Sequence, residues 1–385
     1  MSRYGWQVEL TGWVQTDLVA WSQDSLDELN PSTGAPLNQD RFLIRRGRLR
    51  VEGRRDGLWG AVELDGNTVD GPTARILAAQ VGWKYRELVA LTAGMFRVPF
   101  GAEVMMSERV KPFLEPPTVS RALFPGNYDA GVMASGRYGV ARWAVALTNG
   151  APVGDAQWRG RDPTTSFDVV GRIGADIAGP MRSRVEFGVS ALTGTGLSPG
   201  TPPTKDQLEW VDENQDGVVQ STELRVVPGT VGTPSQPFHR DALGADLAVH
   251  WCLCALGNGV AFAEVAIGTN LDRAVVYADP IKRARAVREL GFSLGVVQDI
   301  TPYAQLGVRY DQYDADRDAV EREGVDLVTI RQRFSTLAIM AAARWQAARF
   351  VVQYDRERNP FGRADDGAPT TRSADRVTLR AQVGF

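Results

Sequence analysis

Six residues between Asp212 and Glu223 have the types and spacing of a calcium-binding loop. They are Asp212, Asn214, Asp216, Val218, Gln220 and Glu223, at positions one, three, five, seven, nine and twelve. Side-chain oxygens, a backbone carbonyl at position seven and a bidentate Glu at position twelve form an oxygen cage for this ion, and Gly217 permits the sharp turn. Isolated Asp-rich turns can mimic the motif. We expect a structural calcium ion here.

A second set of chemically capable residues is a run of alternating arginines, Arg46, Arg48 and Arg50. In a strand these side chains share one face, with about 7 Å between successive guanidinium groups. Such groups suit anionic solutes. The alternative is that acids on neighbouring strands neutralise them. The candidate acids are Glu52, Glu63 and Asp65. The sequence leaves both readings open.

A catalytic site is not indicated. Gly291–Gly295 fits the nucleophile-elbow pattern G-x-S-x-G, but that elbow needs a strand-to-helix turn. These residues instead lie within an alternating segment. Only His239 and His250 are available as bases for a serine nucleophile. We therefore expect no enzymatic activity, and a lipid hydrolase is the less favoured alternative.

Composition narrows the class of protein. Hydrophobic residues make up 43% of the 385 residues, and no run of about 18 apolar residues occurs, which excludes a transmembrane helix. The net charge of -3 argues against nucleic-acid binding. Arginine supplies 39 of the 43 basic residues. A GC-rich genome would give this bias, and so would a water-filled passage for anions.

The elements that position these residues are sixteen alternating segments, each typical of a β-strand with one apolar and one polar face. They are roughly 6–20, 41–54, 58–66, 74–86, 88–98, 128–138, 141–149, 167–178, 182–193, 240–254, 259–270, 285–297, 302–313, 328–345, 347–356 and 374–385. Short turns and long loops alternate between them. That arrangement is typical of an outer-membrane β-barrel with short periplasmic turns and long external loops.

The last segment predicts how the barrel closes. From Arg376 its residues alternate strictly between polar and apolar, and the chain ends on Phe385. An exposed terminal edge strand would promote aggregation unless another strand covered it. The N-terminal run with Trp6, Val8 and Leu10 on one face is the expected partner. A terminal strand ending in Phe also resembles the last strand of bacterial outer-membrane barrels.

In a barrel, an arginine near the membrane midplane on the lipid face would cost about 2–4 kcal/mol, so the three arginines must face the lumen. A half-apolar connector follows the fifth segment. Its charged residues are Glu108, Arg109, Lys111, Glu115 and Arg121, and its apolar residues are Met105, Met106, Phe113 and Leu114. Such a loop is unsuited to lying free in water. It is expected to fold into the barrel, pack its apolar residues on the wall and narrow the lumen with its charges. The alternative is an external loop packed on a neighbouring subunit.

Three stretches resemble the phosphate-selective porin O and P family. They are Phe42–Gly53, the strand end Phe96–Gly101 and the return Phe124–Gly131. Asn127-Tyr128-Asp129 stands where the family often has an Arg before the Asp, and the chain has only four lysines. The resemblance implies an inward-folded constriction loop and a homotrimer.

We therefore predict an all-β protein: one 16-stranded antiparallel transmembrane barrel over residues 1–385. Residues 96–131 form a strand end plus an inward-folded loop, and residues 194–239 form a long external loop with the calcium motif. The predicted function is an outer-membrane porin for passive diffusion of small hydrophilic solutes or ions, with anion preference as an option. A mainly structural or docking barrel with a plugged lumen is the alternative. Both termini are expected in the periplasm, and a signal peptide is expected to have been removed.

Overall fold

A computed structural model describes residues 2–3, 5–22, 40–161, 163–253, 256–323, 326–329, 332–363 and 369–385. In this part of the chain, sixteen antiparallel strands form a closed barrel. They are β2 (Trp6–Trp21), β3 (Arg41–Arg55), β4 (Leu58–Asn67), β5 (Thr73–Tyr85), β6 (Val89–Arg97), β7 (Tyr128–Tyr138), β8 (Ala141–Thr148), β9 (Asp168–Ala178), β10 (Arg184–Ser198), β13 (Gln236–Leu253), β14 (Gly257–Thr269), β15 (Arg288–Asp299), β16 (Ala304–Asp314), β19 (Arg333–Trp345), β20 (Ala348–Arg363) and β21 (Pro369–Gly384).

The remaining elements are short. β1 (Ser2–Arg3) pairs with the start of β2, and two small hairpins lie in the long loops. The hairpins are β11 (Gln207–Trp210) with β12 (Leu224–Val227), and β17 (Val320–Glu323) with β18 (Asp326–Thr329). The helices are α1 (Ala102–Met105), α2 (Thr118–Leu123) and the 3-10 turn η1 (Ser221–Glu223). None of the described helices has the length and apolar character needed to cross a bilayer.

Both faces of the wall follow the alternation of the sequence. In β21, Leu379 is 43% exposed on the outer face, whereas its neighbour Arg380 is 5% exposed and faces the interior. The described strands repeat this pattern around the barrel, with exposed Val, Leu, Ile and aromatic side chains outside. The predicted fold is therefore confirmed: an apolar belt surrounds a polar interior, as a bilayer requires.

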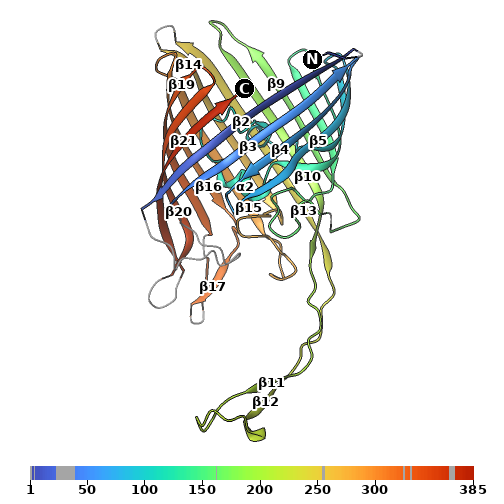
Figure 1. Cartoon of the computed structure of the whole chain (residues 1–385), viewed down its shortest axis with the longest axis vertical. Coiled ribbons are helices and arrows are strands. Elements are labelled where there is room, and N and C mark those ends of the chain that lie inside the picture. The colour runs from blue at the N-terminus through green and yellow to red at the C-terminus, as the bar shows by residue number, and fades with distance from the viewer. Residues whose placement is uncertain are drawn as a thin grey trace.

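The two ends of the barrel differ as expected. Short turns and both termini lie at one end, and the long loops lie at the other (Figure 1). The β11–β12 hairpin projects well beyond the long-loop end. The first long connection, residues 23–39, lies outside the described residues.

Two details of the strands differ from the prediction. Several strands are longer than their alternating segments: β10 and β13 stay paired as far as Ser198 and Gln236. Backbone hydrogen bonding continues into the loop region, where side-chain alternation no longer marks a membrane face. The closing pair also has another register. β21 pairs with Trp13–Trp21 of β2, not with the run from Trp6 to Leu10, because tilted strands of a barrel are staggered.

Candidate functional site

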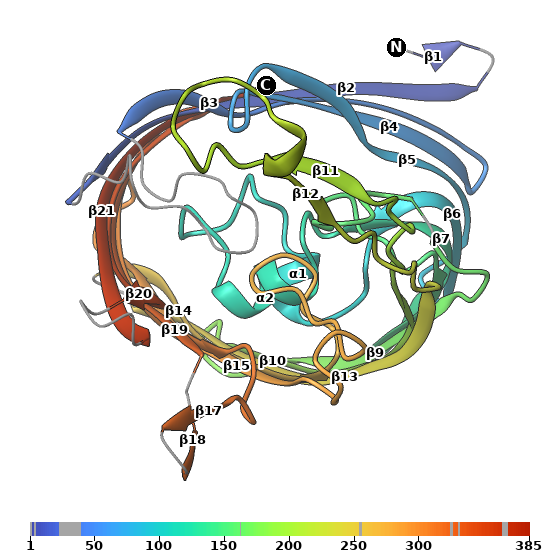
Figure 2. The same cartoon turned by 90° about the horizontal axis from the view of Figure 1, so that it is seen from below.

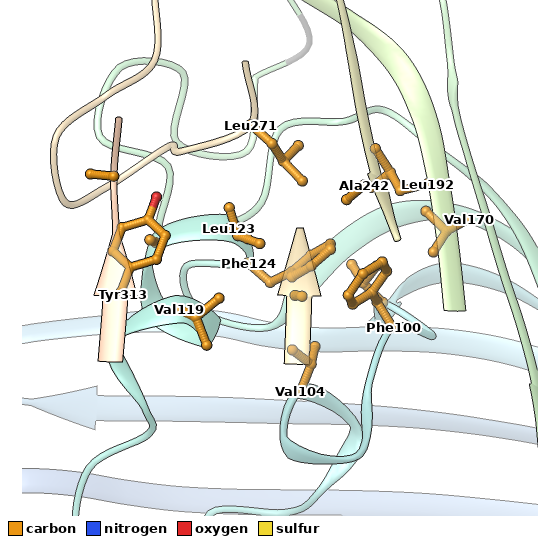
Figure 3. Packing of buried hydrophobic residues seen from close by; sticks show 14 of the residues in the cluster. Phe100, Val104, Val119, Leu123, Phe124, Val170, Leu192, Ala242, Leu271 and Tyr313 are labelled. Carbon is orange, nitrogen blue, oxygen red and sulfur yellow. The ribbon is translucent and has the colours of Figure 1, made fainter. Parts of the chain in front are cut away.

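The connector between β6 and β7 lies inside the barrel. Viewed from the long-loop end, α1 and α2 occupy the lumen (Figure 2). The rings of Phe100 and Phe124 are 4.6 Å apart between centroids. They join a buried cluster with wall residues, including Val170 and Leu192 (Figure 3). Apolar packing therefore holds the two ends of the loop on the wall, as expected for an inward-folded loop.

The middle of the loop packs in the same way further round the barrel. Phe113 and Leu114 form a second buried cluster with wall residues that include Met340. Glycines in the wall make room for the loop: a Cβ at Gly244 would lie 2.8 Å from the Phe100 ring. The Gly291 of the apparent nucleophile motif lies within β15, against Val119, and makes no strand-to-helix turn.

The loop backbone is bound to the wall by polar side chains. Arg349 donates to the carbonyl oxygens of Lys111 and Pro112 at 2.6 and 2.7 Å. Arg380 donates to that of Leu114 at 3.0 Å, and Arg309 to that of Glu115 at 2.7 Å. Buried carbonyls need such partners. Wall side chains thus fix the loop's path through the lumen.

The predicted arginine run faces the interior, and two of its members are paired with acids. Arg48 contacts Glu63, Asp65 and Glu108 at 3.4, 3.2 and 2.8 Å. Arg50 contacts Glu52 at 2.7 Å and Glu63 at 3.4 Å. The three acids foreseen from sequence therefore do neutralise these arginines, and the loop adds a fourth.

The third arginine of the run differs. Arg46 donates to the side-chain oxygen of Gln15 at 3.0 Å. No carboxylate among the described residues lies within ion-pair distance of it. Within this part of the chain Arg46 therefore has no direct ion-pair partner, although Glu115 and Glu108 of the loop act on its charge from a greater distance.

Glu108 is the main electrostatic anchor of the loop. It is buried and contacts Arg48 at 2.8 Å and Arg97 at 3.0 Å, while Asn127 donates to it at 2.9 Å. Burial raises the pKa of Glu108, but Arg48, Arg97 and Lys111 outweigh burial and lower it to about 2. Glu108 is therefore ionised at neutral pH and bridges the loop to β3 and β6.

The other predicted loop charges divide into two groups. Lys111 is buried and contacts Glu103 at 2.9 Å, so it stabilises the loop. Arg109 and Arg121 are exposed, and within the described part of the chain neither has a carboxylate partner. The guanidinium of Arg109 lies over Gly384, which has no side chain to obstruct it. Arg109 and Arg121 are thus the loop charges available to solutes.

Arg45 also faces the interior, although the sequence pattern does not predict it. Strict alternation would put it on the lipid face, but the pairing register shifts between Gln15 and Thr16, which is a β-bulge. Arg45 contacts Glu115 at 2.6 Å. A doublet of adjacent arginines inside a barrel strand could have revealed the bulge, since only a bulge lets both face water.

A cavity of about 1300 Å³ lies between the loop and the short-turn end of the barrel. Several ion pairs line it, and in the pairs of Glu52 and Glu186 the guanidinium is more exposed than its carboxylate. The pair Arg55–Asp56, at the turn after β3, is the reverse, at 46% and 84%. The side chain of Arg142 is 40% exposed and that of Glu186 is 24% exposed. Arg50 and Arg54 are 29% and 61% exposed, while Glu52, which both contact, is 13% exposed. Where these pairs line the cavity, its surface therefore exposes more positive than negative charge, although the charges of each pair cancel.

Comparison with known proteins agrees with this architecture. Residues 15–191 match the model of the family described as phosphate-selective porin O and P. The chain is an outer-membrane porin. Over its first half it resembles this family. No curated protein matches it in sequence.

Solved structures similar to the porin are outer-membrane barrels of low sequence identity. The outer membrane channel DcaP of Acinetobacter baumannii has 12% identity and a TM-score of 0.62, with 100% of this chain and 99% of that chain covered. The anion-selective porin from Comamonas acidovorans has 10% identity and a TM-score of 0.57, covering 99% and 100%. The trimer form of OmpT from Vibrio cholerae has 10% identity and a TM-score of 0.58, covering 99% and 100%. At these identities the likeness concerns the fold.

The calcium motif of the porin lies at the tip of the projecting hairpin, between β11 and β12. The backbone N–H of Asp216 donates to Asp212 Oδ1 at 3.2 Å and to Asn214 Oδ1 at 3.0 Å. Gly217 has a φ of 70° and donates to Asp212 Oδ2 at 3.0 Å. Glu223 instead accepts a bond from Trp210 Nε1 at 3.0 Å. Among the described residues, no three His, Cys, Asp or Glu side chains are grouped closely enough to hold a metal.

Proposed function

We propose that this porin is a passive diffusion channel for small hydrophilic solutes and that it prefers anions. The observation that carries the preference is the orientation of the ion pairs around the cavity. The guanidinium groups of Arg50, Arg54 and Arg142 are more exposed than the carboxylates of Glu52 and Glu186 that they contact. A passage with low-dielectric walls focuses the field of the nearest charges. A solute therefore meets positive charge first, although the pairs are nearly neutral.

Two further observations support the proposal. Arg46, Arg109 and Arg121 add positive charge without a carboxylate partner among the described residues. The similar barrel from Comamonas acidovorans is described as anion-selective. The residues proposed to line the passage are accordingly Arg46, Arg50, Arg54, Arg109, Arg121 and Arg142. Arg48, Glu108 and Lys111 are assigned to anchoring the loop. The proposal includes no catalytic activity.

The test is the reversal potential of purified porin in a planar bilayer under a potassium chloride gradient. The proposal requires a potential that corresponds to higher permeability for chloride than for potassium. A cation-preferring potential would contradict the anion preference while leaving the channel in place. Absence of any conductance would instead support the structural or docking role.

We also propose that the porin is a homotrimer whose short turns and termini face the periplasm. The trimer form of the similar OmpT supports the assembly, and the location of both termini at the short-turn end supports the orientation. A tag in the turn Arg55-Asp56-Gly57 should then remain unlabelled on intact cells. Labelling of that tag would reverse the orientation.

Finally, we propose that the segment from Asp212 to Glu223 binds a structural calcium ion. The ligand types at the six motif positions support this. The turn also supports it: Asp212 and Asn214 both accept from the N–H of Asp216, and the Asp216 side chain accepts from the N–H of Val218. To bind calcium, the carboxylate of Glu223 would have to release its hydrogen bond from Trp210 Nε1. External sites of this kind can fill even with dissociation constants of about 10⁻⁴–10⁻³ M.

A further inference from the structure

Two methionines of the constriction loop are not packed on the wall. Met105 and Met106 are exposed, in contrast to Phe113 and Leu114, which corrects the expectation that all four pack there. Both methionines line the cavity at the short-turn end, as do Met133 of β7 and Trp59 of β4. An apolar patch therefore borders a cavity that is otherwise charged.

The position of this patch is fixed by its backbone. Glu264 accepts hydrogen bonds from the N–H groups of Ala102 and Glu103, at 3.0 and 2.9 Å. Arg97 donates to the carbonyl oxygen of Met105 at 3.1 Å. These contacts hold α1 at both ends. The side chains of Met105, the last residue of α1, and of Met106 are thereby kept at the cavity and outside the buried clusters.

Guanidinium groups line the same cavity. Arg50 and Arg54 come from β3, and Arg142 from β8. A guanidinium recognises a carboxylate through paired hydrogen bonds. A methionine thioether is polarisable, adapts its shape and makes favourable contacts with aromatic rings. One solute could contact both kinds of group.

We propose that this cavity favours anions with an apolar body, such as aromatic carboxylates, over anions of equal charge without one. The inference rests on the proposed anion preference and adds the class of solute. The carboxylate contacts the arginines, and the ring covers Met105, Met106 and Trp59. Contacts of this kind are weak enough for the solute to leave, which conduction requires.

The test compares sodium benzoate with sodium acetate in planar bilayers that contain the full-length porin. The double variant Met105→Gln, Met106→Gln should lower the benzoate-to-acetate permeability ratio by about fourfold, the factor expected when about one buried methylene group is lost. The control is Met181→Gln, an exposed methionine in the turn between β9 and β10, outside the cavity lining. It should leave the ratio unchanged. An unaltered ratio in the double variant would overturn the proposal.

A second measurement needs no variant. Millimolar benzoate should reduce the chloride current of the unmodified porin more than equal acetate does, and equal effects would overturn the proposal. Reversal potentials in potassium chloride distinguish a failure of the proposed anion preference from a failure of the proposed preference for anions with an apolar body. Chloride preference together with an unaltered benzoate ratio defeats this inference alone. If the unmodified porin does not prefer chloride but the double variant still lowers the benzoate-to-acetate ratio, the proposed anion preference is contradicted. The contact between the solute ring and the two methionines is then still supported.

Discussion

Phe385 and Gly12 close the barrel. They exchange two backbone hydrogen bonds, 2.9 Å from Phe385 N to Gly12 O and 3.2 Å from Gly12 N to Phe385 O. The Phe385 ring occupies the space that a side chain at position 12 would need: an added Cβ would lie 2.4 Å from it. The last residue therefore completes the hydrogen-bond ladder and covers a glycine on the outer face.

This relationship predicts that Gly12→Leu destabilises the closed barrel. The added side chain must displace the Phe385 ring, and overpacking of this kind costs about 1–3 kcal/mol. Heat-modifiable mobility in SDS measures the effect as a lower temperature of unfolding. The control is Gly171→Leu on β9, where an added Cβ meets no atom closer than 4.0 Å. Equal unfolding temperatures for the two variants would contradict the role of the Phe385 ring.

Selectivity should depend on the exposed arginines of the cavity. Arg54→Gln with Arg142→Gln removes two charges that face the solute, so the chloride-to-potassium permeability ratio should fall. The fall should be up to about threefold for each unit charge removed at about 7 Å in water, and smaller at high salt. Reversal potentials measure it. Arg182→Gln, in the turn between β9 and β10 and outside the cavity lining, should have no effect. An effect as large from Arg182→Gln would show that the cavity does not set selectivity.

Loop anchoring should depend on pH through Glu108. Because its pKa lies below the ordinary value, at about 2, the ionised carboxylate stabilises the anchored loop. This contribution is complete above about pH 4.5 and is lost as the pH falls towards 2. Channel conductance should therefore rise and become noisier between pH 4 and pH 2.

The matching variant is Glu108→Gln, which cannot ionise. Its conductance should be high at pH 7 and should change little down to pH 2, because Arg48 and Arg97 have already lost their partner. Glu87→Gln, at an exposed short turn, should behave like the unmodified porin. If Glu108→Gln retained the acid-dependent rise, the rise would come from another group.

The calcium proposal predicts a local effect. Chelation should raise protease sensitivity near residues 212–223 and leave the barrel intact, because the barrel ladder closes strand to strand. Asp212→Ala should reproduce the effect without a chelator, whereas Glu209→Ala, an exposed residue of β11 outside the motif, should not. Equal protease resistance with and without calcium would reduce the motif to an Asp-rich turn.

The sequence predicted the barrel well because alternation and loop length are local signals. All sixteen strands were located, and the lumen side of Arg48 and Arg50 followed from the cost of charge in lipid. What it could not predict depends on contacts between distant segments. The register of Gly12 against Phe385 depends on barrel stagger, and the inward position of Arg45 on a bulge. The exposure of Met105 depends on how the wall anchors α1.

Contacts between distant segments also decide which of the predicted site residues are buried and which face solute. Composition shows that Glu108, Arg109, Lys111 and Arg121 are charged, but only packing decides which of them face solute. The sequence predicts that the charges of the loop, Glu108 and Lys111 among them, narrow the lumen, and the structure buries both of these residues in ion pairs. Glu108 pairs with Arg48 and Arg97, and Lys111 pairs with Glu103. No rule of sequence spacing predicts these pairs.

The most direct test of the whole account is single-channel conductance before and after deletion of Met105–Pro117. If the loop narrows a water-filled passage without supporting the wall, the unmodified porin should conduct. The deletion variant should then conduct more and keep its heat-modifiable fold. Equal conductance of the two proteins would contradict the constriction, and an unmodified porin that conducts nothing until the loop is removed would show that the lumen is plugged.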